Sequence, residues 1–77
     1  MNQQQRKQIV TLMAKLDELR TSAENLKDEM QEAWDELSEN AQESDRGQRA
    51  EEQVGQLESA VESLESAYME LENATGE

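Results

Sequence analysis

The chain has 77 residues, 19 acidic and seven basic side chains, and a formal net charge of −12 at pH 7. It contains no cysteine and no histidine, which excludes disulfide bonds, thiolate and imidazole metal ligands, and the side chain that most often serves as a general base. So short a chain forms one domain with a small core, and residues 1–77 are therefore treated as a single domain.

A long helix is the first element that the pattern predicts, over about residues 4–37. Its apolar residues recur in alternating steps of three and four, the spacing of one face of a coiled-coil helix. They are Ile9, Leu12, Leu16, Leu19, Ala23, Leu26, Met30, Ala33 and Leu37. The sequence has no run of roughly 20 apolar residues, the length that spans a bilayer, so we expect no membrane contact and a cytoplasmic protein.

Residues 38–48 interrupt the apolar pattern and are predicted to connect two helices, with room for one helical turn. Ser38 and Ser44 are both candidate N-caps, because a serine hydroxyl accepts a hydrogen bond from a free amide of the first turn. Ser44 is the preferred cap of the next helix, since the negative charge of Asp45 is then favourable against the helix dipole.

A second long helix is predicted over about residues 45–73, with Gly76 just past it as a stop signal. The stretch from Leu57 to Ala74 repeats one seven-residue unit. Apolar residues again follow in steps of four and three, at Ala50, Val54, Leu57, Val61, Leu64, Tyr68 and Leu71.

Together these patterns predict an all-α protein, an antiparallel two-helix coiled-coil hairpin. Folding the chain at about residue 41 brings Leu26 near Leu57 and Leu19 near Leu64. We therefore expect core positions to oppose core positions along the whole hairpin.

The apolar face is wider than two helices cover. The residues that widen it are Val10, Met13 and Met69 near the chain ends, and Ala60, Ala67 and Ala74 on the second helix. Two explanations stay open. Two hairpins can associate into a four-helix bundle, which makes the protein a homodimer, or the face can be a docking groove for an apolar side chain of another protein.

The sequence offers little for catalysis. Serine side chains have no histidine beside them to activate a nucleophile. Paired carboxylates such as Glu32 with Asp35 and Glu36 with Glu39 lie one turn apart, but on an exposed helix they are solvated surface. Di-metal sites in helix bundles use a Glu-x-x-His motif, which this chain lacks. We expect no enzyme activity, no cofactor and no metal site.

Trp34 is the only tryptophan and lies beside the apolar face near the predicted connection. It is expected either to cover the end of the hairpin core or to be an exposed aromatic anchor in an interface, where tryptophan is enriched.

Acidic residues are distributed unevenly. Eight of them and no basic residue lie between Asp28 and Asp45, and eight more follow Ala50, again without a basic residue. On the second helix, Glu58, Glu62 and Glu65 follow one flank about 5–6 Å apart along the axis. Because a helix surface built only for stability would use Glu–Lys pairs, this imbalance favours mimicry of the phosphates of DNA.

The stretch EMQEAWDELSENAQESDRGQRAEEQVGQLESAVESLESA, residues 29–67, resembles a type of small acidic phage and prophage protein. Such proteins have two helices and a Ser-Asp/Glu-Arg-Gly element before a glutamate-rich second helix, here residues 44–47. The resemblance implies a phage accessory setting. Small acidic phage proteins include DNA mimics that inhibit host nucleases, CRISPR effectors, restriction enzymes or uracil-DNA glycosylase.

The leading functional prediction is a non-enzymatic inhibitor in the cytoplasm of a bacterial host. It would occupy the basic DNA-binding groove of a host DNA-processing enzyme and bind no nucleic acid itself. The candidate partner-binding residues are Glu32, Asp35, Glu36, Glu39, Glu43, Asp45, Glu58, Glu62, Glu65 and Trp34.

Two alternatives remain. The first is a coiled-coil interaction module, an adaptor, scaffold part or antitoxin, that acts through its apolar seam. The second is an RNA-binding hairpin dimer, for which five basic residues could form a strip. These are Arg6, Lys7, Lys15, Arg20 and Lys27.

Overall fold

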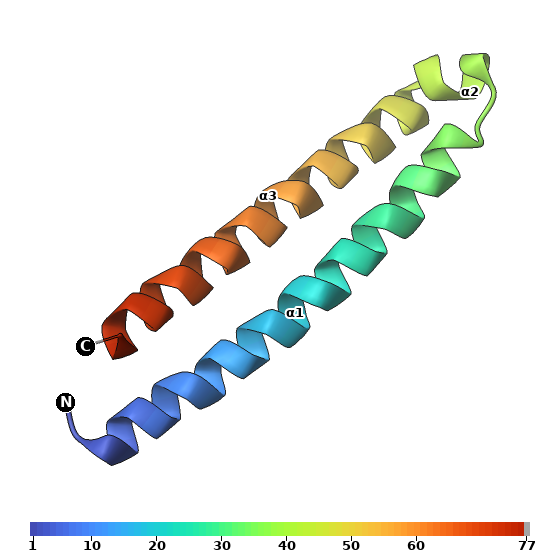
Figure 1. Ribbon diagram of the computed structural model, residues 1–77. Helices are drawn as coiled ribbons and strands as arrows, with labels where there is room; N and C mark the ends of the chain where they lie inside the picture. The colour runs from blue at the N-terminus through green and yellow to red at the C-terminus, as the bar shows by residue number, and fades with distance from the viewer. Residues whose placement is uncertain (77) are drawn as a thin grey trace.

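The computed structural model describes residues 1–76, which form two long helices and a short one between them. Helix α1 spans Gln3–Asp35, α2 spans Glu39–Glu43 and α3 spans Asp45–Thr75. Helices α1 and α3 lie side by side in opposite directions, with both chain ends at one end of a rod of 58 × 14 × 13 Å (Figure 1). The all-α prediction with two long packed helices is confirmed.

Helix α1 ends two residues earlier than predicted. The amides of Glu36 and Leu37 bond to the carbonyls of Glu32 and Trp34, and the backbone then becomes extended at Ser38. The Ser38 hydroxyl accepts a hydrogen bond of 3.2 Å from the Ala41 amide and so caps α2. The predicted single helical turn is thus present as α2. It is separate from α1 because the backbone at Ser38 is extended.

Ser44 caps α3, as the sequence predicts. Its hydroxyl accepts a hydrogen bond of 3.2 Å from the Gly47 amide and donates one of 2.6 Å to the Ala41 carbonyl. Helix α3 then continues to Thr75, two residues beyond the expected end, and Gly76 follows it. We call residues 36–47, the connection together with the first three residues of α3, the tip.

The face of α3 that packs on α1 is the predicted one. Val54 and Val61 are buried, and they are the only buried apolar side chains among the described residues. The other predicted apolar positions of this helix are half-buried: Ala50, Leu57, Leu64, Tyr68 and Leu71.

The face that α1 turns toward α3 differs from the prediction. Its half-buried residues follow steps of four and three at Ile9, Met13, Leu16, Arg20, Ala23, Lys27, Met30 and Trp34, and Glu24 at the edge of this face is half-buried as well. Leu12, Leu19 and Leu26, predicted as core, are instead 49%, 57% and 48% exposed. The expectation that core positions oppose core positions throughout is therefore wrong for this row, and Ala33 and Leu37 are exposed as well.

The rotation of α1 has a physical cause at the tip. The Trp34 indole N–H donates a hydrogen bond of 2.9 Å to the Gly47 carbonyl, which turns the Trp34 side of α1 toward α3. Leu16, Ala23 and Met30 form a central row that belongs to both the predicted and the observed face. The row of Leu19 lies on one side of it and the row of Arg20 on the other, so α1 is rotated by roughly 50° from the predicted orientation. Arg20 and Lys27 tolerate the inner position because their long aliphatic stems pack while their charged groups reach water.

Candidate interaction surfaces

The two flanks of the α1–α3 contact differ in chemistry. On one flank, which we call the charged flank, Arg20 lies between two acids of its own helix. Its Nη1 is 2.8 Å from Oε2 of Glu24 and its Nη2 is 3.0 Å from Oδ1 of Asp17. The side chains of Arg20 and Lys27 are only 29% and 23% exposed, less than the leucines of the other flank. Basic side chains therefore cover the seam here.

Acidic neighbours favour the charged forms of both basic groups. The hydrogen bond to Asp17 raises the pKa of Arg20, with further contributions from Glu24 and from Glu65 of α3. The hydrogen bond to Asp28, 3.2 Å from Nζ, raises the pKa of Lys27, and Glu58 of α3 adds to this effect. Both cations thus attract carboxylates across the helix contact.

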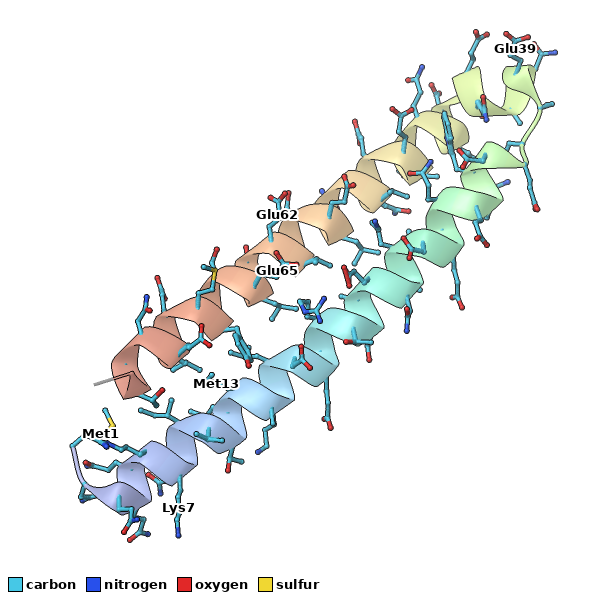
Figure 2. The ribbon with its side chains drawn as sticks, viewed as in Figure 1. Met1, Lys7, Met13, Glu39, Glu62 and Glu65 are labelled. Carbon is cyan, nitrogen blue, oxygen red and sulfur yellow. The ribbon has the colours of Figure 1, made fainter. Side chains whose placement is uncertain are left out.

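This arrangement changes the interpretation of the glutamate row on α3. Glu65 and Tyr68 line one shallow hollow with Asp17 and Arg20 of α1, so Glu65 faces a base of the same chain. Figure 2 shows Glu65 toward α1 and Glu62 away from it. Of the three predicted phosphate mimics on this helix, Glu58 and Glu65 therefore lie near Lys27 and Arg20, and Glu62 is directed outward.

The opposite flank is apolar. Leu12, Leu19 and Leu26 form a row at seven-residue spacing along α1, each about half exposed. On α3, the residues at seven-residue spacing on the side away from Glu58 and Glu65 are small. They are Ala60, Ala67 and Ala74, of which Ala67 is half-buried and the others are exposed.

The leucine and alanine rows lie on the same side of the molecule. On α1 the leucines are on one side of the central row and Arg20 is on the other. On α3 the alanines are on one side and Glu65 is on the other. Because Arg20 and Glu65 meet on the charged flank, the two apolar rows meet on the opposite flank. We call this surface of six residues the Leu–Ala face.

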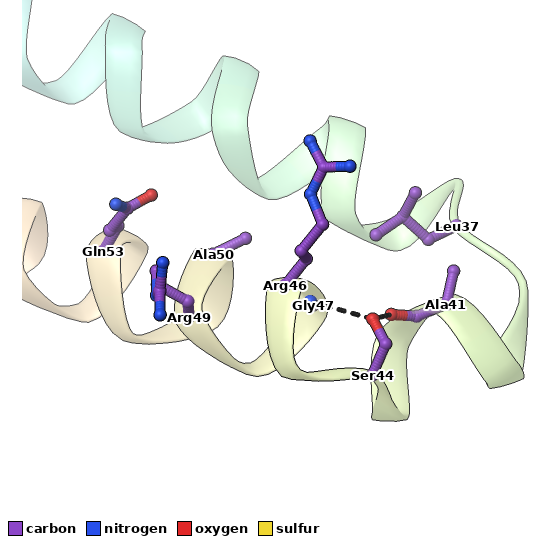
Figure 3. A pocket seen from close by; sticks show the side chains of 8 residues that line it. All are labelled: Leu37, Ala41, Ser44, Arg46, Gly47, Arg49, Ala50 and Gln53. Carbon is purple, nitrogen blue, oxygen red and sulfur yellow. Dashed lines mark hydrogen bonds between the residues drawn. The ribbon is translucent and has the colours of Figure 1, made fainter.

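Two hollows lie where the Leu–Ala face reaches the tip. The smaller one, of about 210 Å³, is lined by Met30, Ala33, Trp34, Leu37 and Ala50. The larger one, of about 510 Å³, extends along the start of α3, where Arg46 and Arg49 border Leu37 and Ala50 (Figure 3). The apolar surface thus continues to the tip and ends beside two arginines.

Trp34 covers the end of the seam, the first of the two roles expected for it. It is half-buried, its indole N–H is bonded to Gly47, and its carbonyl accepts a hydrogen bond of 3.0 Å from the Gln42 side chain. A Cβ added to Gly47 would overlap the Ala41 carbonyl oxygen and lie 2.6 Å from that of Gln42. Close packing at the tip therefore requires glycine at this position.

The predicted acidic residues of the tip region are all exposed. Among the described residues, no basic group lies within 4 Å of these carboxylates, whereas the neighbouring Asp28 pairs with Lys27. Near Arg46 and Arg49, but without an ion pair to either, the structure thus brings these carboxylates to one end of the rod. They are Glu32, Asp35, Glu36, Glu39, Glu43 and Asp45.

Within residues 1–76, no group of three or more acidic side chains has an arrangement that could hold a metal ion. None of the described helices is long and apolar enough to cross a membrane.

Comparisons with protein-family models, curated proteins and solved structures give no match for this chain. Its resemblance to small acidic phage proteins therefore stays a prediction, and functional inference depends on the two flanks and the tip.

Two residues that shape these surfaces were missed in the sequence. Arg20 and Lys27 are not among the predicted apolar positions of the first helix, and the sequence predicts them only as part of a possible basic strip. Their spacing of seven, in the row that also holds Met13 and Trp34, was the available signal.

Proposed function

We propose that this protein is a non-enzymatic interaction module that binds an apolar helical surface through its Leu–Ala face. The observation that carries the proposal is the row of Leu12, Leu19 and Leu26, each about half exposed although the seam beside it is occupied. Large apolar side chains that recur on one face and remain uncovered are typical of a protein-binding surface.

The size of the effect supports a binding role. Covering the exposed half of one leucine side chain contributes about 1 kcal/mol, since full burial contributes roughly 1.5–3 kcal/mol. The neighbouring alanines add little area, but they let a partner helix approach closely. Three leucines therefore contribute roughly 3 kcal/mol, about a third of a micromolar binding free energy, which is about 8 kcal/mol.

The test compares proteins retained from a bacterial lysate by the wild-type chain and by two variants. Leu19→Glu places a charge on the Leu–Ala face, and Thr21→Glu adds the same charge to the exposed outer side of α1. We expect retained partners to be lost with Leu19→Glu and kept with Thr21→Glu. Equal retention by both variants would exclude the face as the binding surface.

A second candidate function is the DNA-mimic inhibitor of a host DNA-processing enzyme, and the acidic tip favours it. Six exposed carboxylates lie between Glu32 and Asp45 with no basic group within 4 Å among the described residues. Such a surface is attracted to a groove lined by lysine and arginine, and added salt screens the attraction. Trp34 is not available as its apolar anchor while it is bonded to Gly47.

Competition with DNA tests this candidate on a panel of host nucleases, restriction enzymes, CRISPR effectors and uracil-DNA glycosylases. Wild-type protein should displace DNA from one of them, and the effect should weaken as salt rises. A variant with lysine at 32, 36 and 39 should lose the effect, whereas one with lysine at 58, 62 and 65 should keep most of it. Unchanged inhibition by the first variant would exclude the acidic residues at 32, 36 and 39 as the surface that competes with DNA.

A further inference from the structure

The spacing of the Leu–Ala face identifies its occupant. We propose that a second copy of this chain covers it, with the two copies stacked face to face and their tips at opposite ends. The product is a four-helix bundle in which α1 packs antiparallel on α1 of the partner and α3 on α3. The proposal rests on the use of this face for binding, and it adds the partner and its direction.

The face is symmetric under reversal. Leu12 and Leu26 are each seven residues from Leu19, so a twofold axis at Leu19, perpendicular to the helices, exchanges Leu12 with Leu26 of the partner. Ala60 and Ala74 are related in the same way about Ala67. Because Arg20 and Glu65 line one hollow, Leu19 and Ala67 lie within a helical turn of one level. One axis therefore serves both rows, as the self-complementary interface of a twofold dimer requires.

The charge distribution selects the direction. Residues 1–27 carry five basic and three acidic side chains, whereas residues 28–45 carry eight acidic and no basic side chains. Copies stacked with their tips together would bring the two tip halves, residues 28–56, to the same end. Each half carries ten acidic and two basic side chains, so these like-charged halves repel. Copies with opposed tips place residues 28–35 of each beside the start of α1 of the other, within residues 1–27, whose net charge is positive.

The Leu–Ala face lies within the overlap of the two copies. With the axis at Leu19, the middle of Gln3–Asp35, the face meets its copy while α1 overlaps α1 of the partner over about 50 Å. Its leucine rows meet at the spacing of packed helices, and its alanine rows permit closer approach. The seam of the bundle then includes the leucines that the antiparallel pair alone leaves half exposed.

Sedimentation equilibrium tests the association. We expect the wild-type chain to have the mass of two chains at micromolar concentration and to dissociate on dilution, with tighter association at higher salt because each copy carries −12. Leu19→Glu should be monomeric with unchanged helix content by circular dichroism, since Leu19 is 57% exposed within one copy. Thr21→Glu, the matched charge control, should remain dimeric. A monomeric wild type, or a dimeric Leu19→Glu, would overturn the proposal.

Crosslinking tests the direction, and the absence of native cysteine permits single-cysteine variants. Leu19→Cys should form a covalent dimer with a bis-maleimide whose reach of about 10 Å matches the distance between packed helices. Asn40→Cys at the tip and Ser59→Cys on the outer side of α3 should not. Crosslinking through Asn40→Cys, or none through Leu19→Cys, would overturn the opposed arrangement.

The outcomes also separate this inference from the proposed function. A monomeric wild type that still retains partners in a manner sensitive to Leu19→Glu would overturn the second copy as occupant and leave the interaction module intact. A dimer that depends on Leu19 but retains no other protein supports the second copy and identifies it as the partner of the face.

Discussion

The charged flank and the Leu–Ala face border the same helix contact, yet only one of them is closed by the chain itself. On the charged flank, Arg20 and Lys27 cover the seam and attract Glu65 and Glu58 across it. On the Leu–Ala face, Leu19 and its neighbours are half exposed beside small alanines. A pair of helices with little core can thus use long basic side chains to cover one flank while its leucine row on the other flank stays half exposed.

The largest effect on the difference between the two flanks is expected from a change at the tip, because the tip sets the rotation of α1. Gly47→Ala should lower the free energy of unfolding by about 3 kcal/mol, because the added Cβ overlaps tip carbonyls and overpacking has costs of this order. Gly55→Ala is the matched control. Nothing lies within 4 Å of its Cβ, and it should stabilise α3 by about 0.5–1 kcal/mol. Urea unfolding of both variants measures the contrast, and equal stability would contradict the role of the tip.

The next largest effect is expected from a substitution in the buried contact between α1 and α3, which lies between the two flanks. Val61 is 7% exposed, so Val61→Ala removes buried methyl groups and should lower the free energy of unfolding by about 2 kcal/mol. Leu12→Ala should have a smaller effect on the isolated chain, since Leu12 is 49% exposed. The comparison is made by urea unfolding in the Leu19→Glu background, which removes any contribution of association. A larger loss for Leu12→Ala would show that α1 is rotated the other way.

A smaller effect isolates the bond that fixes the rotation. Trp34→Phe keeps an aromatic ring at the tip but removes the indole donor to the Gly47 carbonyl. It should cost about 1 kcal/mol, the typical net contribution of a hydrogen bond. The amide of Gly47 should also exchange its hydrogen faster, while amides near Val61 should change little. Unaltered exchange at the tip would mean that the bond does not hold α1 and α3 in register.

The smallest effect is expected on the charged flank, where a substitution of Lys27 separates the contribution of its charge from that of its aliphatic stem. Lys27→Gln keeps an aliphatic stem but removes the cation near Asp28 and Glu58, so the melting temperature should fall slightly at low salt. Because added salt screens such attractions, the difference should vanish at high salt. Lys7→Gln, on the exposed start of α1 (Figure 2), should give no local effect of this kind. If the melting temperatures of the two variants shift equally, the effect comes from the net charge of the chain and not from the position of Lys27.

The sequence predicted the helices well because their signals are local. Ser44 caps α3 as expected, and the apolar steps from Ala50 to Leu71 identify its packed face, since only one wide apolar stripe exists on that helix. Gly76 follows the last turn, and a single helical turn fills the connection.

The rotation of α1 could not be predicted in the same way. Three adjacent rows of that helix carry apolar residues, and two of them face α3. Hydrophobicity alone selects the leucine row, because the competing row contains Arg20 and Lys27. The contact that decides is between Trp34 and Gly47, 13 residues apart, and no periodicity within one helix encodes it. The candidate site differs from the prediction for this reason. In the structure Glu58 and Glu65 lie near basic residues, and the predicted core leucines are exposed.

The antiparallel course of α1 and α3 has a consequence for what the chain can carry. Both ends of the described chain emerge at the end opposite the tip (Figure 1), so groups attached to either end share one attachment point. In a dimer with its twofold axis at Leu19, the start of α1 at Gln3 lies about 24 Å from the axis, at 1.5 Å per residue. Groups attached to the two N-terminal ends would then be held roughly 50 Å apart, toward opposite ends of the bundle.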